Sequence, residues 1–274
     1  MSSATLTLLR YPGGKQRQLL SFTHMLPTDP DSYRSYFEPF VGGASVFFHI
    51  NPHKSVLSDI NPELIELYHG IRDHPDEVWE IYQSVPETKW AYYAIRKLNP
   101  KIMDLPYRAA RILYLNRTCF KGMWRHNSQG VFNVGYGGQD RRWSITHQHL
   151  LDVSDRLKRA NLLCSDFENV IDKTREGDFL FLDPPYRPGS FEQIHDHYKF
   201  GSFRFEDQKR LATALSRATR RGVQWTMTNS SHPEIISLYS ECSITPLEVG
   251  TGDQIGRMTN QSQEVLIQNY VEAV

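Results

Sequence analysis

Short apolar runs and helix-like stretches alternate at both ends of the chain. The apolar runs have the length of buried strands and lie at residues 36–40, 55–58, 161–164, 178–182 and 223–227. Asn61 suits the cap of the helix after the second run, Pro62 suits its first position, and apolar residues recur at helical spacing from Leu64 to Ile71. This alternation predicts an α/β fold, with a mainly parallel sheet covered on both faces. Residues 244–249 and 265–269 predict a closing antiparallel pair.

The pattern changes in the middle of the chain. Strand-like runs are missing from about residue 73 to 118, where helical stretches at 77–83, 89–98 and 107–115 are indicated. A polar, Gly-rich stretch at 122–138 then predicts a hairpin or a long loop. We interpret residues 1–72 and 143–274 as one α/β domain, with a second domain, residues 73–142, inserted into it.

Composition limits the class of protein. With 39% hydrophobic and 23% charged residues, the chain is ordinary for a globular protein, and no apolar run reaches the roughly 18 residues of a membrane span. The first residues have neither a basic head nor a long apolar core, so we expect no signal peptide. Three distant cysteines favour a reducing compartment, and the lack of zinc-ligand spacing predicts no metal site.

The charge is balanced overall but not locally. The chain has 31 basic and 31 acidic residues, which argues against unspecific coating of nucleic acid. Between residues 117 and 142, however, only Asp140 is acidic, while five residues are basic. The basic residues are Arg117, Lys121, Arg125, Arg141 and Arg142. A local excess of this kind is expected where phosphates dock.

Asp183-Pro184-Pro185-Tyr186 follows directly after the apolar run at 178–182. It combines a carboxylate at a strand end, a rigid elbow and an aromatic ring. A carboxylate and a backbone carbonyl can accept both hydrogens of an exocyclic amine, while the ring stacks on the base that carries it. A strand-ending aspartate followed by a Pro-Pro turn is also common, so the tetrapeptide alone leaves both interpretations open.

The strand ends also predict a nucleotide-like cofactor. Ligands of open α/β sheets bind outside the carboxyl ends of the strands. Phe40 ends the first predicted strand, and Gly42-Gly43 follow it. Asp59 ends the second strand, where an acid accepts the hydroxyls of a ribose. The glycine spacing is neither G-x-G-x-x-G nor that of a P-loop, which disfavours a nicotinamide-dependent oxidoreductase.

Three further segments extend this picture: Arg10-Tyr11-Pro12-Gly13-Gly14-Lys15, residues 37–47 and residues 57–64. In this order, and followed by Asp183–Tyr186, they resemble the DNA adenine-N6 methyltransferases of the Dam type, from about Leu9 to Tyr270. The resemblance implies a Rossmann-like, S-adenosyl-L-methionine-dependent methyltransferase sheet. Inserted into it would be a mainly helical DNA-recognition domain carrying a β-hairpin.

The implied reaction moves a methyl group from S-adenosylmethionine to N6 of a flipped adenine in duplex DNA, with GATC as the default target. The resemblance assigns catalysis to Asp183, Pro184, Pro185 and Tyr186. It assigns cofactor binding to Tyr11, Lys15, Phe40, Gly42, Asp59, Asp166, Phe167 and Asp183. A helix-capping role is the other interpretation of Asp166.

Residues 116–134 resemble the target-recognition hairpin of the same family, with the pattern N-R-x-x-[FY]-x-G-x-x-R-[HY]-N…F-N-V. The expected DNA contacts are Arg10, Arg117, Lys121, Arg125, Asn127 and Asn133. Arg125 and Asn127 suit base edges, and Lys121 suits a phosphate, as do Arg141 and Arg142. Met123 and Trp124 are either wedges or a small core of the hairpin. The chain departs from familiar members at 119–121, at 123–124 and at Gly135, in parts that read bases.

We therefore expect a cytoplasmic enzyme of a bacterial or phage-infected cell. It would act on double-stranded DNA as a monomer, without a metal ion or a membrane. Two alternatives stay open: a methyltransferase for cytosine N4 or an RNA amine, and a non-catalytic DNA-binding regulator on the same fold. The long loop at 187–202 is a candidate lid.

Overall fold

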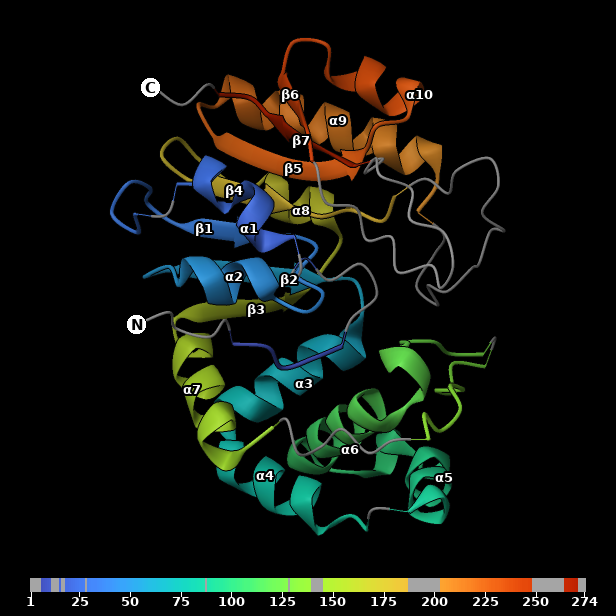
Figure 1. Ribbon diagram of the computed structural model, residues 1–274. Coiled ribbons are helices and arrows are strands. Elements are labelled where there is room, and N and C mark those ends of the chain that lie inside the picture. The colour runs from blue at the N-terminus through green and yellow to red at the C-terminus, as the bar shows by residue number, and fades with distance from the viewer. Residues whose placement is uncertain are drawn as a thin grey trace.

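The computed structural model describes residues 6–10, 15, 18–27, 29–86, 88–127, 129–138, 145–186, 203–247 and 264–270. Seven strands form one sheet in the order β3-β2-β1-β4-β5-β7-β6 (Figure 1). The strands are β1 (Tyr36–Glu38), β2 (Ser55–Asp59), β3 (Ala160–Cys164), β4 (Phe179–Leu182), β5 (Gln224–Ser230), β6 (Ser243–Pro246) and β7 (Glu264–Gln268). The first five in this order are mutually parallel, and β7 is antiparallel to both of its neighbours. The predicted parallel sheet and its closing antiparallel pair are confirmed.

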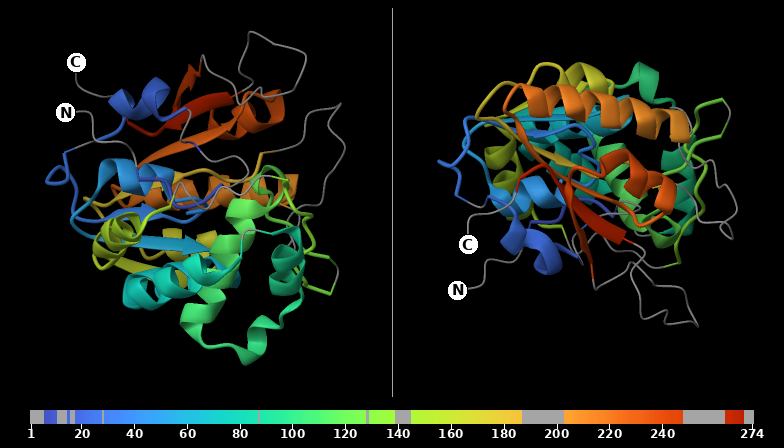
Figure 2. Two further views of the ribbon diagram at one scale, coloured as in Figure 1. Left: turned by 60° about the horizontal axis from the view of Figure 1, so that its bottom comes forward. Right: turned by 90° about the horizontal axis from the view of Figure 1, so that it is seen from above.

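Helices cover both faces of the sheet, as the alternation of side chains along β4 requires. Phe179 and Phe181 belong to one hydrophobic core, and Leu180 and Leu182 to the other. The first core takes α1 (Leu19–Phe22), α2 (Ser45–Ile50), α3 (Pro62–Asp73) and α7 (His147–Leu157). The second takes α8 (Phe167–Ile171), α9 (Phe205–Arg220) and α10 (Pro233–Ile236). Figure 2 shows α9 and α1 on opposite sides of the strands.

Helix α3 begins where the sequence predicts it. The Asn61 side chain accepts hydrogen bonds from the backbone N–H groups of Glu63 and Leu64, at 3.1 and 3.4 Å, and Pro62 is the first helical residue. Its apolar stripe, from Leu64 to Ile71, is buried. The helix therefore leaves the end of β2 in a defined direction, and this places the inserted helices that follow.

The inserted segment is helical as predicted, and it lies below the sheet in Figure 1, beside α3. It contains α4 (Pro75–Ser84), α5 (Lys89–Lys97), the 3₁₀ helix η3 (Pro100–Ile102) and α6 (Leu105–Thr118). Helix α6 packs closely on α3, because Gly70 allows the two backbones to approach. A Cβ atom added at Gly70 would lie 2.4 Å from Cβ of Ala109.

We expect Gly70→Ala to lower the free energy of unfolding by about 1–2 kcal/mol. Overpacking costs about 1–3 kcal/mol, and a Cβ–Cβ distance of 2.4 Å belongs to the upper part of that range, about 2–3 kcal/mol. The gain in helix propensity returns about 1 kcal/mol, which leaves a net loss of about 1–2 kcal/mol. Neither methyl group can rotate away, since both are fixed to helix backbones. Urea unfolding measures the loss. In the double variant Gly70→Ala/Ala109→Gly the clash is absent and most of the loss should be recovered; a fully stable Gly70→Ala protein would contradict the packing argument.

The predicted hairpin after α6 is irregular. The 3₁₀ helix η4 (Phe120–Gly122) follows α6, and only two isolated antiparallel bridges, Cys119 to Tyr136 and His126 to Phe132, join the arms within the described part of this stretch. Asn127 closes the turn, because its side chain accepts from the backbone N–H groups of residues 129 and 131. We refer to residues 119–138 as the recognition segment.

Two short helices, α1 and α8, fall outside the elements that hydrophobic periodicity indicated. Both are too short to show a helical repeat. None of the helices in the described ranges is long and apolar enough to cross a membrane.

Candidate active site

The carboxyl ends of four neighbouring parallel strands bring predicted site residues to one edge of the sheet. Phe40 and Gly42 follow β1, Asp59 is the last residue of β2, Asp166 follows β3, and Asp183 follows β4. These strands are adjacent in the order β3-β2-β1-β4, so residues far apart in the sequence share one rim. This is the place where ligands of open α/β sheets bind.

Asp183 is held by contacts from two directions. Thr228 on β5 donates its hydroxyl hydrogen to Oδ1 of Asp183 at 2.8 Å, and Nζ of Lys15 lies 2.9 Å from the same oxygen. Lys15 also donates to the hydroxyl of Tyr186 at 2.7 Å. The fold thus joins the amino-terminal motif to both ends of the Asp183–Tyr186 tetrapeptide.

Lys15 is only 4% exposed, so its charge is neutralised locally. Asp183 is the nearest carboxylate, and Glu264 lies 4.0 Å away at the edge of β7. Gln18 in turn donates to Glu264 at 2.7 Å. Burial, together with the negative charges of Asp183 and Glu264, raises the pKa of Tyr186 well above its usual value. Tyr186 is therefore a neutral phenol over the ordinary pH range.

A second carboxyl group, Glu38, lies at the end of β1 and was missed by the sequence analysis as a functional residue. It is 2% exposed and accepts a hydrogen bond from the Tyr36 hydroxyl at 2.7 Å. Burial raises the pKa of Glu38 to about 8, and the negative charge of Asp183 adds to the rise. The sequence did contain a signal for Glu38, because a glutamate inside an aromatic, buried strand needs a hydrogen-bond partner or a proton.

The Pro184-Pro185 elbow is braced from behind by a buried amide chain. Gln208 on α9 donates to the carbonyl oxygen of Pro185 at 3.1 Å. Its own amide oxygen accepts from Asn229 on β5 at 3.1 Å. Both amides are buried, so the direction of the elbow is determined by β5 and α9 as well as by the two prolines.

Asp59 forms the second corner of the rim. It is buried and accepts hydrogen bonds from the backbone N–H groups of Gly42, at 3.2 Å, and Asn61, at 3.0 Å. Burial raises its pKa to about 6, while these hydrogen bonds limit the rise. Gly42 has a positive φ of 45°, and its carbonyl accepts from the Tyr68 hydroxyl at 2.6 Å. A carboxylate has about four acceptor positions, so Asp59 retains capacity for a ligand's hydroxyl groups.

Aromatic rings form the third corner, beside β3. The rings of Phe40 and Phe167 stack with centroids 5.3 Å apart, and Phe203 meets Phe40 edge-on at 5.7 Å. Asp166 caps α8 by accepting from the backbone N–H of Glu168 at 2.9 Å, and it is paired with Arg210. The helix-capping interpretation of Asp166 is confirmed, and it places the carboxylate next to the ring of Phe167.

The amino-terminal motif is held by the last turn of α6, directly before the recognition segment. The Asn116 side chain accepts from the backbone N–H of Arg10 at 2.9 Å and donates to its carbonyl oxygen at 2.7 Å. Arg10 also lies against Gly122, where an added Cβ would come within 2.4 Å of Cβ of Arg10. Gly122 has a φ of 68°, so a larger side chain would be strained there as well as crowded. Arg10 thus lies beside the recognition segment.

Arg125 is oriented within the recognition segment. Its Nε donates to Oδ1 of Asn133 at 2.9 Å, so these two predicted DNA contacts form one unit. The neighbouring His126 lies 2.8 Å from Oε2 of Glu63, on the first turn of α3. The recognition segment is therefore held to the rim through the helix that follows Asp59.

Of Met123 and Trp124, the two residues expected to be wedges or a small core, Met123 is partly buried and packs against the core to which Trp124 belongs. Trp124 is 7% exposed and belongs to the core with Phe132 and Val134, whereas Phe120 is 50% exposed. Lys121 is exposed, and its Nζ lies 5.5 Å from the centroid of the Phe120 ring. The small-core interpretation therefore holds for Trp124, and the exposed ring is one residue before Lys121. The sequence could not predict which of these side chains is buried, because an irregular segment has no regular alternation of buried and exposed positions.

Tyr11, Arg141, Arg142 and the candidate lid at 187–202 lie outside the described residues. In the described part of the chain, groups of three or more His, Cys, Asp or Glu side chains that could hold a metal ion are absent.

Comparison with known proteins decides the family. Residues 11–251 match the family described as D12 class N6 adenine-specific DNA methyltransferase. The chain belongs to this family. It is 32% identical over 270 residues to the type II methyltransferase M1.LlaDCHI of Lactococcus lactis subsp. cremoris, covering 95% of this chain and 94% of that protein. It is 29% identical over 266 residues to a DNA adenine methylase of Vibrio cholerae, covering 94% of each.

A third relative is longer. The DNA N-6-adenine-methyltransferase of Escherichia phage P1 is 34% identical over 242 residues, which are 86% of this chain but 31% of the phage protein. The predicted family, fold class and enzyme class are confirmed. The chain is therefore an adenine-N6-specific DNA methyltransferase of the D12 class.

One of the predicted DNA contacts of the methyltransferase does not fit its position. Arg117 is only 7% exposed and lies in the last turn of α6, where every residue from Ala109 to Thr118 is buried. A guanidinium in such a place has little surface to offer a phosphate, so the burial of Arg117 speaks against a direct contact with DNA. Lys121 and Asn127 are exposed, and Arg10, Arg125 and Asn133 are partly exposed, as DNA contacts require.

Proposed function

We propose that this methyltransferase transfers the methyl group of S-adenosylmethionine to N6 of an adenine flipped out of duplex DNA. The observation that carries the proposal is the position of Asp183. It lies at the carboxyl end of β4, held by Thr228 and beside Tyr186, on the rim that also holds Asp59. We further propose residues 73–142 as the target-recognition domain.

Asp183 and the carbonyl oxygen of Pro184 accept the two hydrogens of the adenine amine. The carbonyl oxygen of Pro185 accepts a hydrogen bond from Gln208, and that of Pro184 is the acceptor we propose for the second amine hydrogen. Accepting both hydrogens draws the nitrogen lone pair out of conjugation with the ring. Tyr186 stacks on the base. Asp183 need not be a strong base, because the proton becomes acidic only after N6 is methylated and then leaves to solvent.

Lys15 and Thr228 both contact Oδ1 of Asp183. The carboxylate is thus held by one oxygen and can present the other to the incoming amine. The role of Lys15 in this proposal is to orient and neutralise the catalytic carboxylate.

The rim suits an adenosine-containing cofactor. Asp59 would accept the ribose hydroxyls, and Gly42 allows a ligand to approach the backbone after β1. The partly exposed ring of Phe40, stacked on the buried Phe167, offers apolar surface to an adenine ring. Lys15, Asp166 and Asp183 complete the proposed set, with Tyr11 carried over from the family pattern. S-adenosylmethionine supplies an activated methyl group, so the chain's own residues need only orient the reactants.

Extruding a base from the duplex costs a few kcal/mol, which contacts with the protein must offset. The exposed ring of Phe120 is suited to fill the space that the adenine leaves, and Arg10, Lys121 and Asn127 lie on the same segment or against it. We propose GATC as the target, which is the default of Dam-like enzymes. The chain departs from familiar members of the family at residues 119–121 and 123–124 and at Gly135, so the target sequence needs a test of its own.

The test uses labelled S-adenosylmethionine and three substrates: a duplex with GATC, the same duplex with one base pair changed, and an RNA of matching sequence. Digestion and chromatography are expected to show N6-methyladenine from the first duplex alone. Label in N4-methylcytosine or in RNA would favour the alternative transferase. Tight DNA binding without any transfer would favour a regulator, and equal transfer to both duplexes would reject GATC.

Arg125→Ala is expected to relax discrimination at one base pair by about 1–3 kcal/mol, because a two-pronged contact with a base edge is lost. The ratio of kcat/KM for cognate duplexes and duplexes with a single change measures it. Lys121→Ala is the matched control. It should weaken binding to all sequences alike and reduce the salt dependence of binding, since a phosphate contact carries no sequence information. Unchanged selectivity in Arg125→Ala would reject the assignment.

A further inference from the structure

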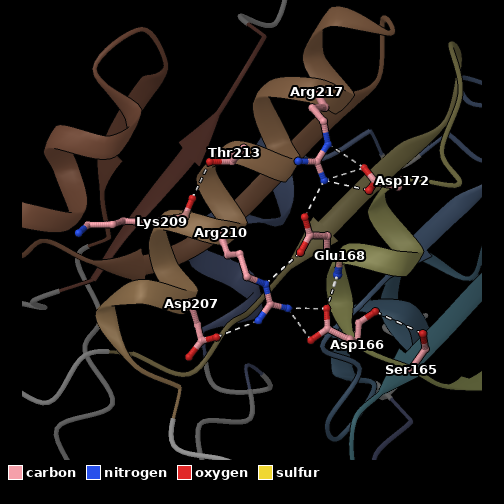
Figure 3. Close-up of polar contacts among 9 residues, drawn as sticks. All are labelled: Ser165, Asp166, Glu168, Asp172, Asp207, Lys209, Arg210, Thr213 and Arg217. Carbon is pink, nitrogen blue, oxygen red and sulfur yellow. Dashed lines mark hydrogen bonds and ion pairs between the residues drawn. The ribbon is translucent and has the colours of Figure 1, made fainter.

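Two arginine side chains of α9 reach across to α8, two helical turns apart (Figure 3). Arg217 binds Asp172 through three contacts of 2.9 to 3.1 Å and Glu168 at 2.8 Å. These contacts join the two helices and involve no residue of the proposed cofactor site. Arg217 therefore provides the structural link between α8 and α9.

Arg210 makes a different set of contacts. Its Nη2 donates to Oδ1 and Oδ2 of Asp166 at 2.6 and 2.7 Å. Nε donates to Glu168 at 2.9 Å, and Nη1 to Asp207 at 3.0 Å. The guanidinium carbon also lies 4.5 Å from the centroid of the Phe167 ring. All three nitrogens are thus engaged, and the planar group has one defined orientation over that ring.

These contacts determine how Asp166 meets a ligand. Of about four acceptor positions on its carboxylate, one takes the backbone N–H of Glu168 and two take Arg210, and one is left on Oδ2. The Phe167 ring is covered by Arg210 and stacks with Phe40. The acceptor edge and the aromatic face beside β3 are therefore both oriented by one side chain.

The fold itself gains little from Arg210. Its side chain is 42% exposed, and ion pairs at such exposure contribute little to stability because water and salt screen them. Arg217 already holds α8 against α9 with comparable geometry. Arg210 differs from Arg217 because it also holds Asp166 and Phe167 in one orientation.

We propose that Arg210 is a positioning residue of the cofactor site. By holding the Asp166 carboxylate, it orients the acceptor edge that receives the adenine ring of S-adenosylmethionine, and by covering one face of Phe167 it fixes the ring on which Phe40 stacks. This inference rests on the proposed function, in particular on the binding of S-adenosylmethionine at the end of β3. It assigns to α9 a part in cofactor binding, in addition to its support of the Pro184-Pro185 elbow.

The test compares Arg210→Gln with Arg217→Gln in the full-length protein. Calorimetric titration with S-adenosylmethionine gives Kd, methylation assays give kcat and KM, and thermal unfolding reports stability. Arg210→Gln is expected to raise both the Kd and the KM for S-adenosylmethionine about tenfold, because one hydrogen bond to the cofactor is weakened when Asp166 is no longer held in place. The value of kcat should stay nearly unchanged. Arg217→Gln should keep the wild-type Kd, although both variants lose a similar small amount of thermal stability. Arg210→Lys keeps the charge without the planar fork and should bind with an affinity between wild type and Arg210→Gln.

Wild-type affinity in Arg210→Gln would overturn this inference while leaving the proposed function intact. Equal losses of affinity in Arg210→Gln and Arg217→Gln would also overturn it, because they would show a structural role shared by the two arginines. If the wild-type protein itself fails to bind S-adenosylmethionine, the proposed cofactor site and this inference are both wrong.

Discussion

Asp183→Ala is expected to lower the rate of methyl transfer by on the order of 10²- to 10³-fold, the loss typical of removing a preorganised group that stabilises charge in the transition state. Asp183 would accept an amine hydrogen and lies beside the positive centre that forms as N6 attacks. Its removal also takes from the buried Lys15 its nearest carboxylate. Single-turnover assays with saturating DNA and S-adenosylmethionine measure the rate. Cofactor binding should weaken but persist, because Asp59 and the ring pair remain.

Two further variants separate chemistry from folding. Asp183→Asn preserves the volume and an acceptor for Thr228 while removing the charge, and a loss of similar order is expected. Asp178→Asn is the matched control: it removes a buried carboxylate from the residue just before β4 and breaks the pair with Arg34 at 2.6 Å. It should lower thermal stability and leave the transfer rate close to wild type. A wild-type rate of methyl transfer in Asp183→Asn would contradict the assignment of Asp183 as the catalytic carboxylate.

Glu38→Gln is expected to stabilise the protein at alkaline pH. The pKa of Glu38 is about 8 in the folded protein, against 4.5 for an ordinary glutamate. Between these pH values the folded protein keeps a proton that the unfolded chain has lost. Stability is therefore fully present below pH 4.5 and falls as pH rises towards 8, by up to about 1.4 kcal/mol per pH unit. Glutamine imitates the protonated acid, so the variant lacks this loss, and its advantage should reach several kcal/mol.

Urea unfolding of Glu38→Gln and wild type at pH 5, 6, 7 and 8 measures the effect. The difference in unfolding free energy is expected to grow across the series in favour of the variant. Glu77→Gln, at an exposed site on α4, controls for the change of residue type. A difference that is the same at pH 5 and pH 8 would show that Glu38 is ionised throughout, and that the hydrogen bond from Tyr36 outweighs burial.

Much of the sheet could be predicted because its determinants are local. The apolar run at 179–182, the Asn61 cap and the helical stripe after it each depend on a few neighbouring residues. The rim followed from the rule that parallel strands end on the same side. In this way Asp59 and Asp183 could be assigned to one edge without knowledge of the strand order.

The parts that could not be predicted depend on contacts between distant segments. Arg117 and Arg125 are both arginines of one basic stretch, yet the packing of α6 buries the first and leaves the second beside Asn133. Helix α9 buries a stripe from Leu211 to Ala218. That Gln208 and Arg210 on the same helix reach the elbow and the Phe167 ring could not be predicted, because neither partner is near in sequence.

The double hydrogen bond between Asn116, in the last turn of α6, and the backbone of Arg10 joins the inserted helices to the amino-terminal stretch of the chain. Only four residues separate Arg10 from Lys15, whose ammonium group is paired with Asp183. The helices of the insert and the Asp183 carboxylate are therefore both attached to the same short stretch of the chain.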